Sequence, residues 1–302
     1  MPVHRILYKY VDAEGLKRLW ESEKIRFTQL NQLNDPYENR IFDPNVDMKV
    51  HELKELSNNN QELFKLLFHV KKTQSKQYLE EIQNEIDNRF GVFSLTRNPM
   101  NLLMWAHYAD EHKGAVVGLD VSNPIFRDIG IIRNPDEGNV VYSSIKPKIF
   151  KQIDTEFQPK EDGKGYSVIS SLKDSCHIDF AFLYKGIDWA YEEEVRIVRD
   201  FFVEKGEVKR IKDKEIVLFP LPKSAIKTVI FGDRYTDDIT KNSMLTSEMD
   251  IEFFKASIDD YEYKIRITPL NKALETEKKI LPRLPLKGQM IKGNNNRKQR
   301  KK

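Results

Sequence analysis

The sequence predicts an α+β fold with a mixed, largely antiparallel sheet and a helical insertion. Short runs rich in β-branched and aromatic residues, typical of strands, recur between residues 4 and 267. Residues 47–90 instead place apolar side chains at three- and four-residue steps, which indicates two or three amphipathic helices. Runs of strands are followed by runs of helices, and this order argues against a doubly wound parallel sheet.

The first predicted elements are a strand, a short helix and a second strand. HRILYKY at residues 4–10 has the composition of a strand, and Asp12 then starts a helix whose apolar residues fall at helical spacing. Lys24–Thr28 is the second strand. A turn follows at Asn34–Pro36, because proline disfavours the helical conformation in the residue before it.

Strand patterns dominate again from Gly91. VFSLT at residues 92–96 is a strand, MNLLMWAHYADEH at 100–112 is a helix, and AVVGLDV at 115–121 is the next strand. Helices are expected near Tyr166–Tyr184 and Asp237–Ser247. The further predicted strands are Val140–Ser144, Ile145–Phe150, Trp189–Phe202, Glu207–Lys212, Ile216–Phe219, Thr228–Phe231, Ile251–Ala256 and Tyr261–Ile267.

The chain is expected to form one domain over residues 1–270, with the insertion at about 47–90, followed by a C-terminal extension at 271–302. Residues 287–302 hold seven Lys or Arg and no acid, so a net charge of +3 for the whole chain leaves −4 on the rest. Such a basic tail can contact phosphates of RNA or DNA, solubilise the chain, or be ordered by a protein partner.

The bulk composition favours a cytoplasmic protein. No run of 18 apolar residues predicts a membrane span, and the N-terminus lacks the apolar stretch of a signal peptide. The single cysteine, Cys176, excludes an internal disulfide and fits a reducing compartment.

The segment KGIDWAYEEEVR at residues 185–196 concentrates charge within a predicted strand. Side chains alternate between the two faces of a strand, so Glu192, Glu194 and Arg196 would share one face. A carboxylate held beside a cleft can stabilise a positive charge or take a proton. The same pattern also fits a solvated edge strand whose charges pair across the sheet.

Other candidate groups lie between residues 94 and 112. Trp105 and Tyr108 share a helical face and either pack in the core or wall a pocket that stacks a flat ring. The hydroxyl of Ser94 either bonds a ligand or faces solvent. His107 and His112 are five residues apart, which suits a shared metal poorly, and no metal site is expected.

Four motifs together resemble a bacterial family catalogued as domain of unknown function 2971. They are NDPYE at 34–38, the segment at 93–120 that begins FSLTRNPMNLL, KGIDWAYEEEVR at 185–196 and IKTVIFGDRY at 226–235. The motifs stand in the order of the family, and the resemblance covers about residues 5–255.

The opening LYKYVDAEGLKRLWESEKIRFT is similar, more weakly, to the start of ADP-ribosyltransferases. This resemblance implies a split sheet and NAD as a substrate. It implies a ribose-contacting residue at Lys9 or Tyr10, where those enzymes carry a His or Arg. The remaining implied positions are a ring-stacking residue among Trp105, His107 and Tyr108, and a late-strand catalytic carboxylate at Glu194, with Glu192 as the alternative.

The resemblance also implies a different role for each charged residue of the site. Glu194 would stabilise the oxocarbenium-like charge that develops as nicotinamide leaves the ribose, and Glu192 would orient the acceptor. Arg196 would bind a carboxylate or the diphosphate through two parallel contacts. Further donors to the diphosphate would be Arg97, Lys113 and Lys185.

Three functional hypotheses follow. The first is a NAD-dependent mono-ADP-ribosyltransferase that acts as a bacterial toxin or phage-defence effector on nucleic acid, with an antitoxin as a protein partner. The second is a non-catalytic module that recognises nucleic acid, RNA included, or a phage component. The third is a nuclease that binds Mg²⁺ through Asp35, Glu38, Glu192 and Glu194.

Overall fold

The structure is a computed structural model that describes residues 5–38, 80, 84, 86–145, 153–159, 166–172, 182–211, 214–235, 237, 243–246 and 249–280 of the 302-residue chain. The predicted helical insertion at 47–90, apart from its last residues, lies outside this range. So do Cys176, the basic tail and the predicted strand Ile145–Phe150 beyond its first residue.

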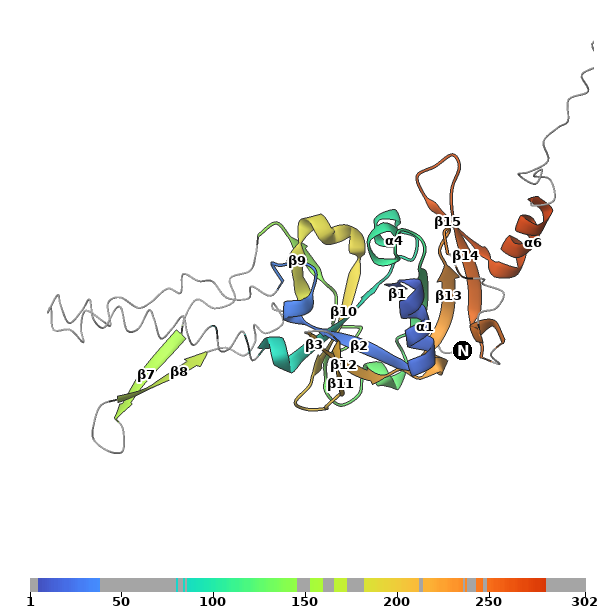
Figure 1. Cartoon of the computed structure of the whole chain (residues 1–302). Helices are drawn as coiled ribbons and strands as arrows, with labels where there is room; N and C mark the ends of the chain where they lie inside the picture. Colours follow the sequence, from blue (N-terminus) through green and yellow to red (C-terminus); the bar gives the residue numbers. More distant parts are fainter. Residues whose placement is uncertain are drawn as a thin grey trace, which may run out of the picture.

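A large, mixed and mostly antiparallel sheet forms the body of the molecule, as the sequence predicts (Figure 1). The β13–β14 pair is parallel, whereas the other strand pairs of this sheet are antiparallel. In spatial order its strands are β11 (Glu207–Ile211), β12 (Lys214–Pro220), β2 (Lys24–Gln29), β3 (Phe90–Thr96), β1 (Ile6–Val11), β4 (Ala115–Asp120), β13 (Ile226–Phe231), β14 (Glu252–Ile258) and β15 (Ile265–Pro269), with β10 (Glu194–Asp200) and β5 (Ile131–Arg133) attached through β3.

Two smaller sheets and a few helices complete the described fold. β6 (Val141–Ser143) pairs with β9 (Tyr184–Gly186), and β7 (Ile153–Pro159) pairs with β8 (Tyr166–Leu172). The α-helices are α1 (Ala13–Ser22), α4 (Leu102–Tyr108) and α6 (Leu270–Ile280), and the 3-10 helices are η1 (Leu30–Gln32), η2 (Pro124–Phe126), η4 (Ile187–Glu192), η5 (Lys223–Ala225) and η7 (Ser243–Thr246).

β3 is the branch point of the large sheet. β10 pairs along one whole edge of β3, from Glu194 opposite Thr96 to Asp200 opposite Phe90. β1 and β2 share the other edge, because β1 meets it at Thr96 and β2 meets it at Val92. The two strands therefore separate beside Ser94, which lies between these registers.

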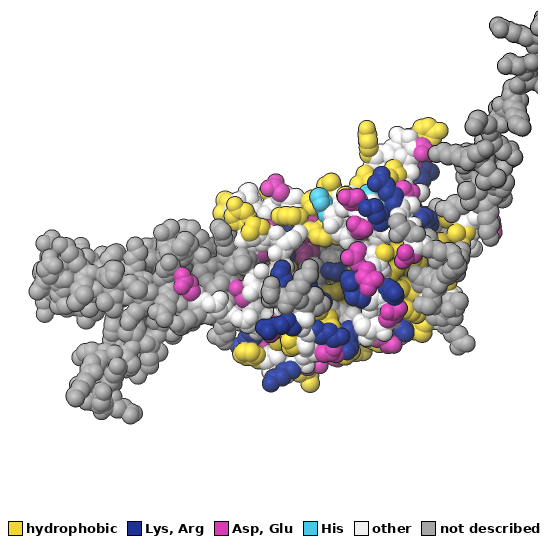
Figure 2. All heavy atoms as spheres, in the orientation of Figure 1, with side chains coloured by type: hydrophobic (Ala, Val, Ile, Leu, Met, Phe, Trp, Pro, Cys, Tyr) yellow, Lys and Arg dark blue, Asp and Glu magenta, His cyan; other side chains and the backbone are white. Residues whose placement is uncertain are grey.

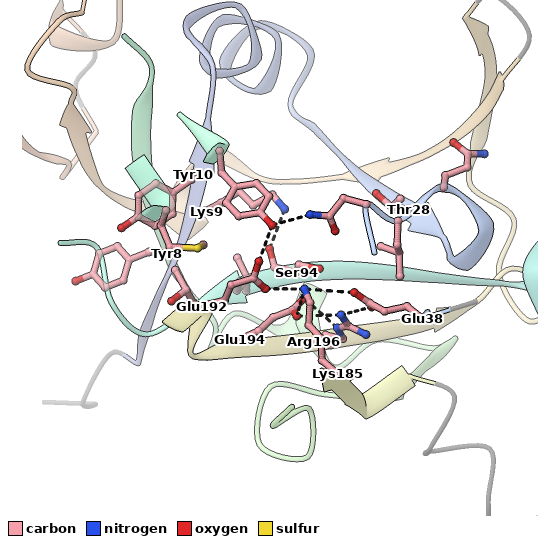
Figure 3. A pocket seen from close by; sticks show the side chains of 17 residues that line it. Tyr8, Lys9, Tyr10, Thr28, Glu38, Ser94, Lys185, Glu192, Glu194 and Arg196 are labelled. Carbon is pink, nitrogen blue, oxygen red and sulfur yellow. Dashed lines mark hydrogen bonds and ion pairs between the residues drawn. The ribbon is translucent and has the colours of Figure 1, made fainter. Parts of the chain in front are cut away.

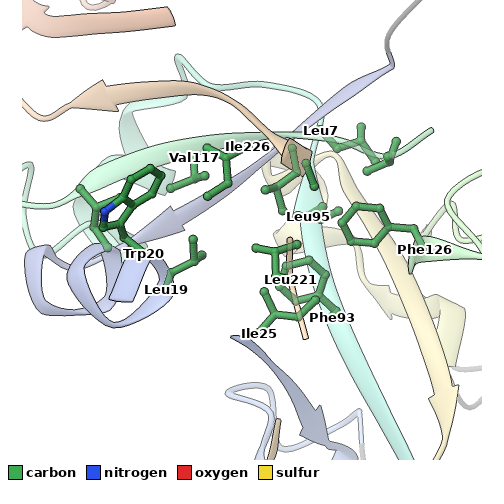
Figure 4. Close-up of a cluster of buried hydrophobic side chains, with 14 of the residues drawn as sticks. Leu7, Leu19, Trp20, Ile25, Phe93, Leu95, Val117, Phe126, Leu221 and Ile226 are labelled. Atoms are coloured by element: carbon green, nitrogen blue, oxygen red, sulfur yellow. The ribbon is translucent and has the colours of Figure 1, made fainter. Parts of the chain in front are cut away.

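The main hydrophobic core fills one face of the sheet (Figure 4). Asp12 caps α1 by accepting a hydrogen bond from the backbone of Gly15, as the sequence predicts. The buried face of α1 then packs against alternate residues of the strands. This cluster includes Leu16, Leu19, Trp20, Ile25, Phe27, Phe93, Leu95, Val117, Leu119 and Val195.

The prediction of one strand over Trp189–Phe202 is wrong in its first part. Residues 187–192 form η4, and Glu193 adopts a left-handed conformation with φ of 45°. Only from Glu194 does the chain pair with β3 as a strand. The left-handed residue breaks the simple alternation of side chains on which the sequence argument rested.

Two other predicted boundaries also move. The helix at 100–112 stops at Tyr108, because Asp110, Glu111 and His112 have positive φ angles of 45°, 53° and 71°. The last predicted strand starts at Ile265 instead of Tyr261, because Asp259 holds a turn through the backbone N–H groups of residues 261 and 262.

The predicted helix at Tyr166–Tyr184 is wrong over most of its described residues, although residues 182–183 are helical. YSVISSL at residues 166–172 is strand β8, whose pairing with β7 suits its β-branched content. Within the predicted helix at Asp237–Ser247, the described residues Ser243–Thr246 form the 3-10 helix η7. No helix among the described residues is long and apolar enough to cross a membrane.

The assignment of the hydrophobic core can be tested by substituting one buried and one exposed leucine. Leu119 on β4 is 0% exposed, whereas Leu103 on α4 is 49% exposed. We expect Leu119→Ala to lower the free energy of unfolding by about 2–5 kcal/mol, because it leaves a cavity in the packed core. Leu103→Ala should change it by less than about 0.5 kcal/mol. Urea unfolding measures both, and equal losses would contradict the assigned core.

Candidate functional site

A pocket opens where β1 and β2 separate along β3. Its volume is about 730 Å³, including the part open to solvent, and Figure 2 shows this face hollowed near its middle. Figure 3 shows side chains from β1, β2, β3 and β10 turned toward one space. The polar residues that line it are Tyr8, Lys9, Tyr10, Thr28, Gln32, Asn34, Glu38, Ser94, Thr96, Tyr108, Lys185, Glu192, Glu194 and Arg196.

Five charged side chains form a buried ionic cluster at the base of this pocket. Lys185 Nζ lies 2.6 Å from Glu192 Oε2, 3.2 Å from Glu194 Oε2 and 3.3 Å from Glu38 Oε1. Arg196 binds Glu194 through Nε and Nη2, both at 2.9 Å, and its Nη2 also contacts Glu38. Three carboxylates thus share two cations.

Glu194 is the carboxylate most strongly held in its ionised form. Its residue exposure is 5%, and that of Arg196 is 1%. Burial alone would raise the pKa of Glu194, but the charges of Arg196 and Lys185 and hydrogen bonds from Arg196 and Ser94 outweigh burial and lower the pKa to about 2. Burial likewise opposes the charge on Arg196, but Glu194 and Glu38 raise its pKa above the ordinary value.

Glu38 is less well satisfied than Glu194. Its Oε1 lies within ion-pair distance of Lys185 but accepts no hydrogen bond. Burial raises the pKa of Glu38, and the attraction of Arg196 and Lys185 does not offset this effect. The cluster therefore contains less positive than negative charge, and Glu38 is the carboxylate whose negative charge is least well compensated.

Glu192 and Glu194 reach the pocket by different routes, so the prediction of one shared strand face is wrong for Glu192. Glu192 is the last residue of η4, whereas Glu194 and Arg196 lie two apart on β10. The left-handed Glu193 between them turns outward and accepts a hydrogen bond from Asn98 at 3.0 Å. The pair converges because of this kink and not because of strand alternation.

Tyr108 and Asn34 complete the surroundings of Glu192. Tyr108 OH donates to Glu192 Oε1 at 2.5 Å and accepts from Asn34 Nδ2 at 2.7 Å. Burial, followed by the hydrogen bond to Glu192, raises the pKa of Tyr108 above its ordinary value. Tyr108 therefore remains a protonated donor at neutral pH.

Lys9 occupies the gap between β1 and β2. Its Nζ donates to the backbone oxygen of Ser94 at 2.9 Å, in the stretch of β3 that neither strand covers. Burial lowers the pKa of Lys9 to about 8, although Glu194 and Glu192 attract the proton. Lys9 thus carries a charge at neutral pH that no direct carboxylate contact neutralises among the described residues.

Most of the predicted site residues line this one pocket. The predicted catalytic residues Glu192 and Glu194 line it. So do five of the seven predicted ligand-binding residues, namely Lys9, Tyr10, Ser94, Tyr108 and Arg196. Trp105 does not, because it is wholly buried and its Nε1 donates to the backbone oxygen of Pro99. His107 is exposed on the outer side of α4. Of the three ring-stacking candidates, only Tyr108 is in place.

Only one of the three predicted diphosphate donors, Lys185, lines the pocket. Arg97 bonds Asn139 and Lys113 pairs with Glu111, both outside the pocket. Lys185 lines the pocket but serves as the counter-ion of three carboxylates. Sequence reasoning missed that role, and it missed Glu38 as the partner of Arg196, although the NDPYE motif at 34–38 had marked the segment.

The carboxylates proposed for Mg²⁺ are committed to other partners. Lys185 and Arg196 stand between Glu38, Glu192 and Glu194, and Asp35 Oδ1 accepts a hydrogen bond from the backbone of Tyr37. Within the part of the chain that the structure describes, no three His, Cys, Asp or Glu side chains are placed to hold a metal ion.

Comparison with known families identifies one match. Residues 104–197 match the family described as protein of unknown function (DUF2971). This span holds Tyr108, Lys185, Glu192, Glu194 and Arg196, and it is narrower than the resemblance over about 5–255 that the motifs suggested. No curated protein and no solved structure matches the chain, so the similarity to ADP-ribosyltransferases stays a prediction.

Removal of the guanidinium tests the buried cluster. We expect Arg196→Met to lower the free energy of unfolding by about 3–5 kcal/mol, because Glu194 and Glu38 lose a buried partner. Arg210, which is paired with Glu215 at the surface, is the matched control. Arg210→Met should cost less than about 1 kcal/mol. Similar losses in the two variants would contradict a buried, interdependent cluster.

The lowered pKa of Glu194 predicts a defined pH dependence of stability. A carboxyl whose folded pKa is about 2 stabilises the fold above its ordinary pKa of about 4.3 and loses this contribution as pH falls through the interval between them. Glu194→Gln should therefore flatten the fall of unfolding free energy between about pH 4.3 and pH 2. Parallel curves for the two proteins over this interval would refute the assignment.

Proposed function

We propose that this chain, which carries a DUF2971 domain over residues 104–197, is a NAD-dependent mono-ADP-ribosyltransferase. The observation that carries the proposal is a carboxylate, Glu194, kept ionised at the base of a pocket beside a second carboxylate, Glu192. The proposed reaction breaks the bond between ribose C1′ and the nicotinamide nitrogen, and the bonding electrons leave with nicotinamide.

The charge balance of the buried cluster suits that reaction. Two cations face three carboxylates, so the cluster has a deficit of positive charge. A ribose that loses nicotinamide becomes oxocarbenium-like, and fixed negative charge stabilises it most in a site with little water. Glu194 is the proposed stabilising group because Arg196 fixes its position at two points.

Glu192 is the proposed partner of the acceptor. It is bonded to Tyr108 and Lys185, which fix its orientation at the pocket wall. As the acceptor's lone pair forms the new bond to C1′, Glu192 takes the acceptor's proton. Two carboxylates with different partners and different surroundings are a common way to divide charge stabilisation from proton transfer.

The branch of the sheet and the position of Lys9 support the same proposal. The separation of β1 and β2 along β3 fits the split sheet that the resemblance implies. Lys9 lies at that separation, at the position where the resemblance expects a ribose contact. Its ammonium, which no direct carboxylate contact neutralises among the described residues, would attract the anionic part of the dinucleotide. The proposed biological role remains that of a toxin or phage-defence effector, controlled by an antitoxin.

Three consecutive glutamates provide the test. Nicotinamide release from NAD should fall about 10²–10³-fold in Glu194→Gln, because a preorganised charge is removed. Glu192→Gln should lower transfer to an acceptor more than it lowers the binding of NAD. Glu193→Gln should leave both unchanged, because Glu193 is exposed and turned away from the pocket.

The assay is chromatography of nicotinamide and of labelled ADP-ribose adducts, with NAD affinity measured by calorimetry. Retained NAD affinity in Glu194→Gln distinguishes a loss of chemistry from a loss of folding. If the wild-type protein neither binds nor consumes NAD with any acceptor tried, the proposed function fails.

A further inference from the structure

A row of aromatic rings extends outward from Tyr108, the ring that lines the pocket. The ring centroids of Trp189 and Tyr191 on η4 are 6.2 Å apart, and the ring centroids of Tyr191 and His107 are 6.4 Å apart. His107 in turn lies 6.3 Å from Tyr108, which is part of the pocket wall. At the other end of the row, the Trp189 ring lies 5.0 Å from Lys185 Nζ. We call Trp189, Tyr191 and His107 the aromatic rim.

Four cationic side chains lie on the face of the sheet that adjoins the other side of the pocket mouth. Strand alternation places Lys24 and Arg26 on the same face of β2 as Thr28, which lines the pocket. The registers of β12 and β11 bring Lys214 and Lys209 to that face as well. We call Lys24, Arg26, Lys209 and Lys214 the cationic shelf.

The shelf has an excess of positive charge and is joined to the pocket. Among the described residues of β2, β11 and β12, Glu207 is the one carboxylate on the same face, and it pairs with Lys24 and Lys209. Arg26 bonds Gln32, which lines the pocket. Figure 2 shows hydrophobic side chains above the hollow on the side of β9, and Lys and Arg among the side chains below it, on the side of β2, β11 and β12.

We propose that a single-stranded nucleic acid binds across this mouth, with its phosphates on the cationic shelf and a base stacked on the aromatic rim. A cationic surface that follows the backbone, together with exposed rings, is the combination that single strands require. The row of rings from Trp189 to Tyr108 would bring a base to the pocket. This inference rests on the proposed function only in making the strand the acceptor of ADP-ribose, since the binding surface stands without NAD.

The two halves of the surface predict two different signatures in binding measurements without NAD. The probes are labelled single strands of DNA and of RNA of about 12 nucleotides, within the roughly 4–16 that such sites cover, and a DNA duplex of equal length. Arg26→Gln with Lys209→Gln should weaken binding and lower the slope of log affinity against log salt by about 0.7 for each phosphate that the variant no longer neutralises. Trp189→Ala should weaken binding about 10-fold without changing that slope.

Matched controls keep the test specific. Lys17→Gln with Arg210→Gln also removes one Lys and one Arg, but α1 packs with the core residues Ile25 and Phe27, on the face opposite the shelf. Arg210 follows Lys209 on β11 and so points to that opposite face. This double variant should bind as the wild type does. Trp189→Phe should restore most of the affinity, and Tyr263→Ala, at an exposed ring in the β14–β15 turn, should have no effect.

The inference is overturned if the two double variants lose affinity equally, if Trp189→Ala has no effect, or if the duplex binds as tightly as the single strands. The full chain is used throughout, so the basic tail contributes equally to every variant. Binding of the strand without ADP-ribose transfer to it would uphold the surface and reject only the role of the strand as acceptor, whereas the proposed function fails separately if NAD is neither bound nor consumed. The stronger of the DNA and RNA arms identifies the nucleic acid.

Discussion

Arg196 joins the parts of the molecule on which the site depends. It lies on β10, bonds Glu194 at two points, contacts Glu38 from the NDPYE segment and donates to the backbone oxygen of Phe182 at 2.7 Å. Burying so many charges costs several kcal/mol for each ion unless every one has close partners. The fold therefore has to bring β10, β9 and the N-terminal segment together accurately, and the pocket forms where they meet.

The shortage of positive charge in this cluster links the stability of the fold to the proposed reaction. A third cation at the base would satisfy Glu38 and stabilise the fold further, but it would also neutralise the field that a cationic ribose requires. Lys9 approaches from the opposite wall and bonds a carbonyl oxygen instead of a carboxylate. The pocket thus offers negative charge at its base and one positive charge at the separation of β1 and β2, which matches a substrate that carries charges of both signs.

Local patterns predicted the elements and several site residues, whereas contacts distant in sequence decided the rest. The capping of α1 by Asp12 and the strand pattern around Ser94 are local properties that the sequence shows, whereas Lys9 was named from the resemblance; both Lys9 and Ser94 line the pocket. Trp105 and Tyr108 share a helical face by spacing, yet only tertiary packing determines that Trp105 is buried while Tyr108 reaches Glu192. The contact of Glu38 with Arg196 spans 158 residues, and no periodicity in a single sequence could reveal it.

The central claim is that the pocket is complementary to a developing positive charge on a ribose ring. The most direct measurement is the affinity of a cationic imino-sugar analogue of ribose compared with its uncharged carbocyclic counterpart. Mimics of a transition state bind about 10²-fold or more tightly than ground-state analogues when the site is built for that charge. The account predicts such a preference in the wild type and its loss in Glu194→Gln. Equal affinity for the two analogues, or a preference that survives Glu194→Gln, would contradict it.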